Sequence, residues 1–395
     1  MSTDLNTSVE VTSDARGGEL PDEAFAVALA SLDAMTTARL RALLHGRSAQ
    51  AAFEVIVEGR LPAELARSHE RDPSLCTRWS SAARRCDVSE LWQRCRDGGI
   101  DVYVHGHIGY PDALVDDPAA PPVLFVRGDL SALQRRRVGI VGTRNATPGG
   151  LRAARGLGET LAGHDVAVVS GLARGIDGAA HRGVRAAIER SVAAPPVAVV
   201  GSGLDVVFPR EHRDLWDWVG DHGVLLSEYP PGTEPLPTHF PARNRILAAL
   251  SEVLVVVESR DVGGSLITVR EAMKRNITVM AVPGSVLHRA SRGTNQLISE
   301  GAAAVLESAD VLVALGLDTR RSGGLPFDPR REPTTADRAV LASFGVDTLA
   351  VDEVVARCGL GVIDTALAIG RLESEGWLVD IGGWYEPANS PQRWT

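Results

Sequence analysis

The chain has 395 residues, of which 44% are hydrophobic, and its formal net charge is −9. That length suits two or three domains, and the apolar content is enough for a sizeable core. No run of about 18 apolar residues occurs, so we expect no membrane-spanning helix. Residues 1–20 are polar and acidic and lack the basic start and apolar stretch of a secretory signal. We therefore expect a disordered tail and a cytoplasmic protein.

The cysteines do not have the spacing of a metal site. Cys76, Cys86, Cys95 and Cys358 form no Cys-x-x-Cys pair and have no matching cluster of histidines. Structural zinc sites usually draw their ligands from such short pairs. We therefore expect reduced core cysteines and no bound metal.

Residues 21–98 are predicted to form a small helical, SAM-like domain. Phe25, Leu29 and Leu32 recur at helical spacing, and a similar pattern follows at Leu40 and Leu43. The candidate turn at 33–37 has no glycine, whereas a helix-hairpin-helix module needs one to bring backbone N–H groups to a phosphate. The sequence therefore gives no support for DNA binding by this domain.

Residues 99–316 alternate valine-rich strands with helices, after a proline-rich connector. The predicted strands are 101–105, 123–127, 138–141, 166–170, 197–200, 224–227, 253–258 and 277–282. Most lack polar alternation, which is typical of parallel strands buried on both faces. The pattern predicts an α/β fold with a Rossmann-like, doubly wound parallel sheet, whose ligands bind at the carboxyl ends of the strands.

The last part of the chain is predicted to be a separate small domain. Residues 317–335 are rich in glycine, proline and charge and indicate a linker. Residues 336–388 contain three helical stretches and two short strands around Gly382-Gly383, which indicate a winged helix. Its expected recognition helix, 361–375, has one arginine and three acidic residues, so a role in protein interaction is favoured over duplex-DNA binding.

Positive charge is concentrated in one stretch of the central domain. Between Arg135 and Arg190 there are ten arginines and four acidic residues. Lys274 is the only lysine of the chain, so contacts with phosphate would be made by arginine, whose planar guanidinium suits bidentate bonds. A solvated helix face would show the same charge pattern, so the arginines alone identify no ligand.

Glycine-rich loops follow five of the predicted strands. In the first, Gly142-Thr143-Arg144 leads to Thr147-Pro148, a helix start whose N–H groups should attract an anion. Such loops, with arginines along one edge of the sheet, suit a nucleic-acid backbone. The candidate DNA contacts are Gly142, Thr143, Arg144, Ser170, Gly171, Arg174, Gly201, Gly203, Arg210, Arg243, Asn244, Arg245, Gly264, Ser265 and Thr268.

Several side chains near these loops have two open interpretations. Phe208, Tyr229 or Phe240 could stack on bases, although for Phe240 a plain core position is favoured. Arg243 and Arg245 could contact DNA or could form structural ion pairs with Glu228 or Glu258.

Common cofactor and catalytic motifs are absent. The first loop is not Gly-x-Gly-x-x-Gly, and the second strand ends in Ser170-Gly171 instead of an acid, so NAD or FAD binding is not expected. There is no Walker lysine, no Gly-x-Ser-x-Gly elbow and no His-Glu-x-x-His. His181, early in a helix, is expected to pack there. We therefore expect no catalytic residue and no cofactor.

The order and spacing of the motifs in residues 100–310 resemble the DprA (Smf) family. The stretches that carry the resemblance are 110–114, 138–144, 170–181, 201–205, 208–210, 226–230, 240–246, 264–268, 282–284 and 295–302. One departure is Arg260-Asp261-Val262-Gly263, which has an extra acid, and a glycine where the family usually has a serine.

The resemblance implies a function in DNA handling. It implies a protein without catalytic activity that binds incoming single-stranded DNA and loads the recombinase RecA on it during natural transformation and recombination. It also implies a homodimer formed through the Rossmann-like domain, and a strand-binding groove that uses Arg144 and Arg210.

One alternative stays open at this point. Proteins of the same fold superfamily include phosphoribohydrolases, so the chain could bind or hydrolyse a nucleotide-derived small molecule. The stretch Gly263-Gly264-Ser265, with Glu258 or Glu271 nearby, could imitate such an active site.

Overall fold

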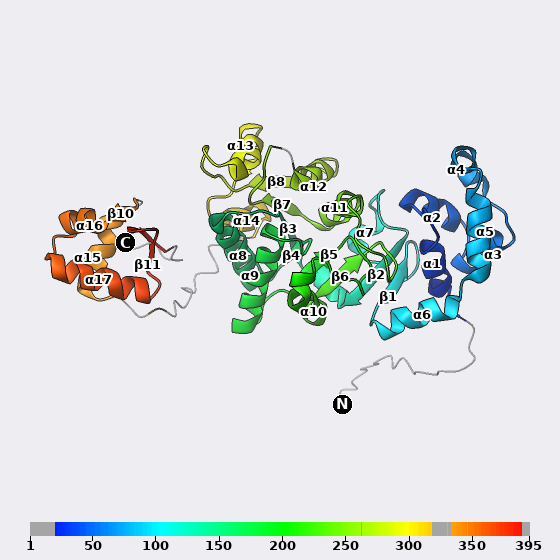
Figure 1. Ribbon diagram of the computed structural model, residues 1–395, viewed down its shortest axis with the longest axis horizontal. Coiled ribbons are helices and arrows are strands. Elements are labelled where there is room, and N and C mark those ends of the chain that lie inside the picture. The colour runs from blue at the N-terminus through cyan, green and yellow to red at the C-terminus, as the bar shows by residue number, and fades with distance from the viewer. Residues whose placement is uncertain (1–19, 262, 318–329, 331–332, 346, 389–395) are drawn as a thin grey trace, which may run out of the picture. The chain divides into compact units, whose positions relative to one another are not determined.

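The computed structural model describes residues 20–388 except 262, 318–329, 331–332 and 346. The chain divides into two compact units, 1–319 and 320–395 (Figure 1). The predicted tail at 1–20 and most of the predicted linker at 317–335 lie outside the described residues.

A nine-stranded sheet lies at the centre of the first unit, in the order β1-β2-β6-β5-β4-β3-β7-β8-β9. Its strands are β1 Asp101–Val104, β2 Val123–Gly128, β3 Arg136–Val141, β4 Val166–Ser170, β5 Val197–Val199, β6 Val224–Ser227, β7 Val253–Val256, β8 Thr278–Ala281 and β9 Ala303–Ala304. From β6 to β9 all neighbours are parallel, whereas β1 and β2 are antiparallel additions. The predicted Rossmann-like, doubly wound sheet is confirmed.

Helices cover both faces of the sheet (Figure 1). They are α7 Asp112–Val115, α8 Pro148–Gly163, α9 Ile176–Arg190, α10 Arg213–His222, α11 His239–Leu250, α12 Gly264–Met273, α13 Arg292–Ser299 and α14 Ser308–Ala314, with short 3₁₀ turns at Leu130–Gln134, Arg210–His212 and Arg289–Ser291. Alternate residues of each strand enter different cores, as the two-residue period of a strand requires. Val138 and Ile140 of β3 pack with α8 and α9, and Val141 packs with the core beneath α11 and α12.

The strand order reverses between β3 and β7. Strand β3 pairs with β4 on one side and with β7 on the other, so the chain leaves β3 in one direction and later returns to its opposite edge. Open α/β sheets bind ligands in the crevice outside the carboxyl ends of the strands at such a reversal. The loops after β3 and β7 are therefore the place where a site is expected.

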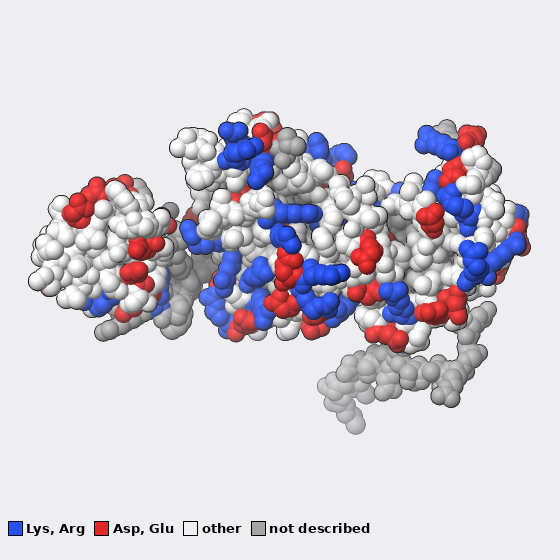
Figure 2. Space-filling model, in the orientation of Figure 1, with Lys and Arg blue, Asp and Glu red and all other residues white. Residues whose placement is uncertain are grey.

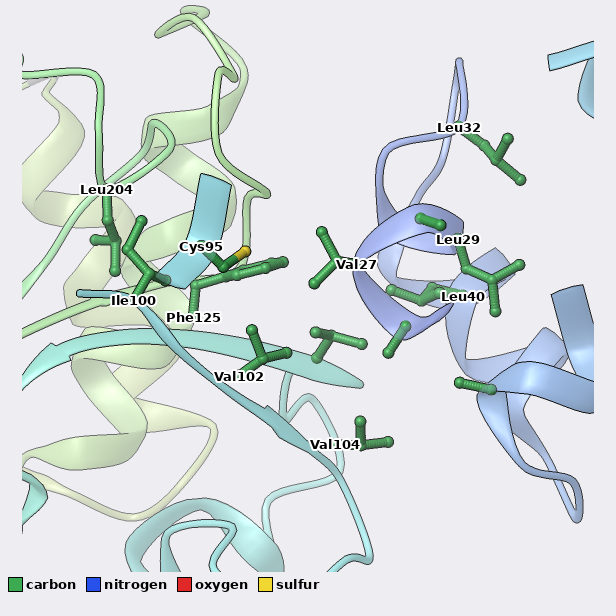
Figure 3. Packing of buried hydrophobic residues seen from close by; sticks show 14 of the residues in the cluster. Val27, Leu29, Leu32, Leu40, Cys95, Ile100, Val102, Val104, Phe125 and Leu204 are labelled. Carbon is green, nitrogen blue, oxygen red and sulfur yellow. The ribbon is translucent and has the colours of Figure 1, made fainter. Parts of the chain in front are cut away.

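The N-terminal helices pack against one edge of this sheet. They are α1 Asp22–Ala30, α2 Thr37–Leu44, α3 Ala49–Val57, α4 Ala66–Arg71, α5 Leu75–Arg85 and α6 Val88–Asp97, with a 3₁₀ turn at Ala63–Leu65. Val27 of α1 shares a buried cluster with Val102 of β1 and Phe125 of β2 (Figure 3). Arg41 also donates a 2.6 Å hydrogen bond to the carbonyl of Ala120. The helical character of this segment is confirmed, and its boundary as a domain at residue 98 stays a prediction.

The second unit contains three helices and a three-stranded antiparallel sheet. Its elements are α15 Thr335–Phe344, β10 Leu349–Ala350, α16 Val351–Cys358, α17 Val362–Ser374, β11 Leu378–Asp380 and β12 Trp384–Pro387, with the strand order β10-β12-β11. Its own core includes Phe344, Leu372 and Trp377. The helices and the two last strands occur where the sequence predicts them, and the winged-helix assignment itself stays a prediction.

Asp337 joins two helices of the second unit. Its carboxylate accepts hydrogen bonds from the backbone N–H and the hydroxyl of Thr334, and one of its oxygens lies 2.7 Å from a guanidinium nitrogen of Arg371. Burial acts to raise the pKa of this carboxyl, but the hydrogen bonds from Thr334 and Arg371 outweigh burial, so the pKa lies below its ordinary value. The ionised form therefore stabilises the folded unit.

We expect Asp337→Ala to destabilise the second unit by about 1–3 kcal/mol, because a helix cap and a charged hydrogen bond are lost together. Since the folded-state pKa is depressed, the contribution should be complete above about pH 4 and should disappear as the pH falls through the folded pKa. Amide hydrogen exchange in residues 335–374 of the full chain measures the effect. Asp347→Ala, which removes an exposed pair with Arg357, is the control and should change exchange little.

Candidate nucleic-acid-binding site

A pocket of about 470 Å³ lies at the reversal of strand order. Its walls come from the loop after β3, the loop after β7, and the first turns of α11 and α12. Eight of the predicted residues line it, namely Gly142, Thr143, Arg144, Arg243, Asn244, Gly264, Ser265 and Thr268. Asp177, Phe208, Phe240, Ser259 and Arg260 also line it, and so do several prolines of the loop before α11.

The side chains of Arg144, Phe240 and Phe208 lie in contact beside the pocket, and we call these three side chains the stack. The guanidinium carbon of Arg144 lies 4.6 Å from the ring centroid of Phe240, and the rings of Phe240 and Phe208 are 5.4 Å apart. Arg144 is exposed and Phe240 is half-buried, so both can be reached from solvent. Phe240 is therefore a wall of the pocket and not a plain core residue. The stack offers a cation and an aromatic face to the same ligand.

The exposed arginines near this stack differ in what balances their charge. Arg210 follows Phe208-Pro209 and is exposed, and like Arg144 it makes no ion pair with any described residue. Arg174 forms an ion pair with Glu211, which raises the pKa of the Arg174 guanidinium and offsets its charge. Figure 2 shows basic side chains over the central helices of this unit, interspersed with acidic ones. The exposed arginines without an ion pair to a described residue therefore include Arg144 and Arg260, which line the pocket, and Arg210, which follows Phe208-Pro209.

The predicted anion site at the start of α8 is wrong, because the protein supplies its own anion. Glu258, at the end of β7, accepts hydrogen bonds from the backbone N–H of Thr147 at 2.9 Å and from its hydroxyl at 2.5 Å. The Thr147 hydroxyl in turn accepts from the N–H of Gly150. A carboxylate thus occupies the place at the helix N-terminus where a ligand anion was expected.

Arg245 forms a structural ion pair with Glu228, which is one of the two roles that the sequence left open. Its guanidinium lies 2.6 Å from a carboxylate oxygen of Glu228, and the side chains are only 14% and 8% exposed. Thr37 of α2 donates a further hydrogen bond to Glu228. The trio joins α11, the end of β6 and the N-terminal helices, so it directs Arg245 away from the pocket.

Arg243 is buried at the back of the pocket and is 4% exposed. Its guanidinium donates to the carbonyl of Val199 and leaves room for no side chain at Gly171. Burial lowers the pKa of Arg243 to about 10, and the carboxylate of Asp177 partly opposes that shift. Burial raises the pKa of Asp177 in turn. The charges of Arg243 and Asp177 therefore act on each other, and both residues line the pocket.

The remaining predicted residues shape the loops without lining the pocket. Ser170 is fully buried, and its hydroxyl donates to the carbonyl of Ile140. Gly201 and Gly203 are buried where the chain passes close to Phe240 and Pro230. His181 is also fully buried, and burial lowers the pKa of its imidazole to about 3, so it is neutral at pH 7.

Metal and membrane features are absent from the part of the chain that the structure describes. No group of three or more His, Cys, Asp or Glu side chains could hold a metal ion there. No described helix is long and apolar enough to cross a membrane. All four cysteines are unpaired, but only Cys95 is fully buried. Cys86 and Cys358 are half-buried and pack against core clusters, so the prediction of core cysteines is wrong only for Cys76, which belongs to no core cluster.

A family model, similar sequences and a solved structure point to one family. Residues 101–316 match the family model of DNA recombination-mediator protein A. The chain is 41% identical over 203 residues to the DNA processing protein DprA of Streptococcus pneumoniae, covering 51% of this chain and 70% of that protein. It is 36% identical to the protein Smf of Escherichia coli, covering 70% and 74%. The X-ray structure of DprA from Streptococcus pneumoniae superimposes with a TM-score of 0.61 and 30% identity, covering 75% of this chain and 98% of that one.

The structure predicts that a buried arginine with an ion pair contributes to the stability of the fold and that an exposed arginine without one does not. We expect Arg245→Ala to lower the free energy of unfolding of the first unit by about 3–5 kcal/mol, because Glu228 loses its partner while it stays buried. Thermal unfolding followed by circular dichroism measures the change. Arg210→Ala is the matched control, and it should leave the midpoint nearly unchanged. Equal midpoints for the two variants would contradict the structural role of Arg245.

Proposed function

Because the chain belongs to the DprA (Smf) family of DNA recombination-mediator proteins, we propose that it binds single-stranded DNA without catalysis and helps to load RecA on it during DNA uptake and recombination. The observation that carries the proposal is the stack of Arg144, Phe240 and Phe208 at the reversal of the sheet, with the exposed Arg210 two residues after Phe208 in the chain. Guanidinium groups attract the phosphates of a strand, and aromatic rings stack on its bases.

The aromatic part of the stack favours a single strand over a duplex. In a duplex the base faces are already stacked on one another, whereas an unpaired base can place its face on Phe208 or Phe240. Neither contact reads a base edge, so binding should depend little on sequence. Both contacts suit a protein that handles DNA of any sequence.

The family resemblance is the basis for the proposed partner and assembly. We propose that RecA is the partner, that the protein forms a homodimer through its Rossmann-like domain, and that it acts in the cytoplasm. We propose no cofactor, since the loop after β3 lacks the dinucleotide fingerprint.

The structure gives no support for the phosphoribohydrolase alternative at the two acids it requires. Both oxygens of Glu258 accept hydrogen bonds from Thr147 at the start of α8. Glu271 pairs with Lys274 at 2.6 Å and with Arg275 at 2.9 Å. Neither carboxylate is free to act as a base in the pocket. Incubation with nucleoside monophosphates should therefore release no free base, and release of base would favour the alternative.

Removing either exposed arginine should weaken DNA binding for all sequences alike. We expect Arg144→Ala and Arg210→Ala each to lower the affinity for a fluorescent oligonucleotide, and to reduce the slope of log K against log salt by about 1, because one phosphate contact is lost. Fluorescence anisotropy over a salt series measures both effects. Arg135→Ala, which removes an exposed arginine paired with Asp165, is the control. Wild-type affinity in both Arg144→Ala and Arg210→Ala would count against the proposal.

A further inference from the structure

We propose that the N-terminal helices carry a second DNA contact, a pocket between α3 and α5 that binds a backbone phosphate of a strand or of a duplex. This α3–α5 pocket has a volume of about 460 Å³ and is lined by Gly59, Cys76, Thr77, Ser80, Ser81, Arg84 and Arg85. It shares no described lining residue with the pocket at the reversal of strand order, so the two sites are separate. The inference rests on the proposed function, because it adds a contact for the same class of ligand.

One face of α5 supplies six of the seven lining residues. They form two rows at four-residue spacing, one of Cys76, Ser80 and Arg84 and one of Thr77, Ser81 and Arg85. Residues four apart lie above one another on a helix, so the two rows form one continuous surface. On the other side, α5 buries Trp79 and Ala83 and packs against α3 (Figure 1). The polar rows are therefore held in place by the N-terminal core.

Arg84 is oriented by the end of α3. Its Nε atom donates a 2.9 Å hydrogen bond to the carbonyl of Val57, and the Ser80 hydroxyl donates to the same carbonyl at 3.1 Å. Val57 is the last residue of α3, where carbonyl groups have no partner within the helix. This arrangement leaves the two terminal nitrogens of Arg84 without a hydrogen bond to any described residue. The guanidinium is thus positioned by the protein and keeps donors for a ligand.

Arg85 completes a pair of cations whose charge is not balanced. One terminal nitrogen of Arg85 donates a 2.5 Å hydrogen bond to the hydroxyl of Ser81, which fixes its side chain along α5. Arg84 and Arg85 are both exposed, and neither forms an ion pair with a described residue. The nearby Arg60, in contrast, is paired with Glu58. Guanidinium groups held in this way bind phosphate oxygens well, because their planar forks are already oriented.

The lining of the α3–α5 pocket suits a phosphate of the DNA backbone and not a base. No acidic and no aromatic side chain is among the lining residues that the structure describes. The hydroxyl of Thr77, exposed on the same face, adds a further donor. Without an aromatic ring there is no surface on which a base could stack, so the contact is limited to the backbone.

This contact does not distinguish a strand from a duplex. Phosphates are accessible in both forms of DNA, whereas base faces are accessible only where the strands are unpaired. The Arg144–Phe240–Phe208 stack should therefore favour a single strand, and the α3–α5 pocket should accept either form. Binding of a duplex is the property that isolates the α3–α5 pocket.

The size of the α3–α5 pocket favours a polymer over a free anion. Its volume of about 460 Å³ lies within the range of about 300–1,000 Å³ that is usual for sites of whole small molecules, so it has room for a phosphate and the sugars on either side. A phosphorylated peptide would also need contacts for its side chains, and the described lining offers no apolar side chain larger than that of Cys76. DNA also gains free energy from the counterions that its phosphates release.

The test is binding of a fluorescent duplex oligonucleotide to the full chain, followed by anisotropy over a salt series. We expect the double variant Arg84→Ala/Arg85→Ala to bind the duplex at least about tenfold more weakly at low salt, and the slope of log K against log salt to fall by about 2. The double variant Arg60→Ala/Arg135→Ala is the matched control, since it removes the same charge from arginines paired with Glu58 and Asp165. It should change duplex binding much less.

The outcomes separate this inference from the proposed function. If the protein binds a single strand but the Arg84→Ala/Arg85→Ala variant binds the duplex as tightly as the wild type, the α3–α5 contact is wrong and the proposed function stands. Absence of duplex binding by the wild type at low salt would also overturn the contact. If the wild type binds no single strand, the proposed function is wrong. Binding of a phosphoserine peptide or of inorganic phosphate that depends on Arg84, without such binding of the duplex, would assign the pocket to another source of phosphate.

A variant that leaves both arginines in place gives an independent check. Thr77 is the exposed third residue of α5, where an acid suits the helix dipole, so Thr77→Glu should fold normally. Its carboxylate would occupy the donors of the pocket and weaken duplex binding about tenfold. Ala38→Glu is the control, because it adds the same charge at an exposed position in the first turn of α2. Equal duplex binding by the two variants would contradict the α3–α5 contact.

Discussion

The reversal of strand order between β3 and β7 is the constraint on which the site depends. The chain leaves β3 toward β4 and returns much later on the other side, so the loops at the ends of β3 and β7 diverge and leave a crevice. Glu258 crosses from the end of β7 to the start of α8 and fixes the two loops together. With this bond in place, Arg144 is held beside α11, where it covers Phe240. The position of the pocket, and of Arg144 and Phe240 at its edge, depends on this arrangement of the two loops.

Four of the five arginines predicted along this edge divide by burial into two kinds, whereas Arg174 is exposed but paired with Glu211. Arg245 is largely buried and forms an ion pair with Glu228, whereas Arg243 is buried, donates to the carbonyl of Val199 and is partly offset by the charge of Asp177. A buried guanidinium without such a partner would cost several kcal/mol. Arg144 and Arg210 are exposed and have no carboxylate partner among the described residues, so their charge is available to a polyanion. This explains how a chain with a net charge of −9 can present a locally basic surface.

The sequence was sufficient for eight of the nine strands of the sheet and for eight of the residues that line the pocket. Valine runs without polar alternation predicted the central strands, and strand-end glycines predicted Gly142, Thr143 and Gly264 as lining residues. Strand β9 was not predicted because two residues carry no periodicity. The hydrogen bonds from Thr147, at the start of α8, to Glu258 were also not predicted. Thr147 and Glu258 are 111 residues apart, and no local sequence pattern connects them. Ser259 and Arg260 could have been found, because they directly follow a predicted strand.

Photocrosslinking tests most directly whether a strand lies on the aromatic stack. An oligonucleotide that carries 5-iododeoxyuridine joins covalently to aromatic side chains on which its base is stacked, and peptide mass spectrometry then locates the attachment. The account predicts attachment at Phe240 or Phe208, and loss of attachment when both are replaced by leucine. Attachment only within the N-terminal helices or the second unit would contradict it.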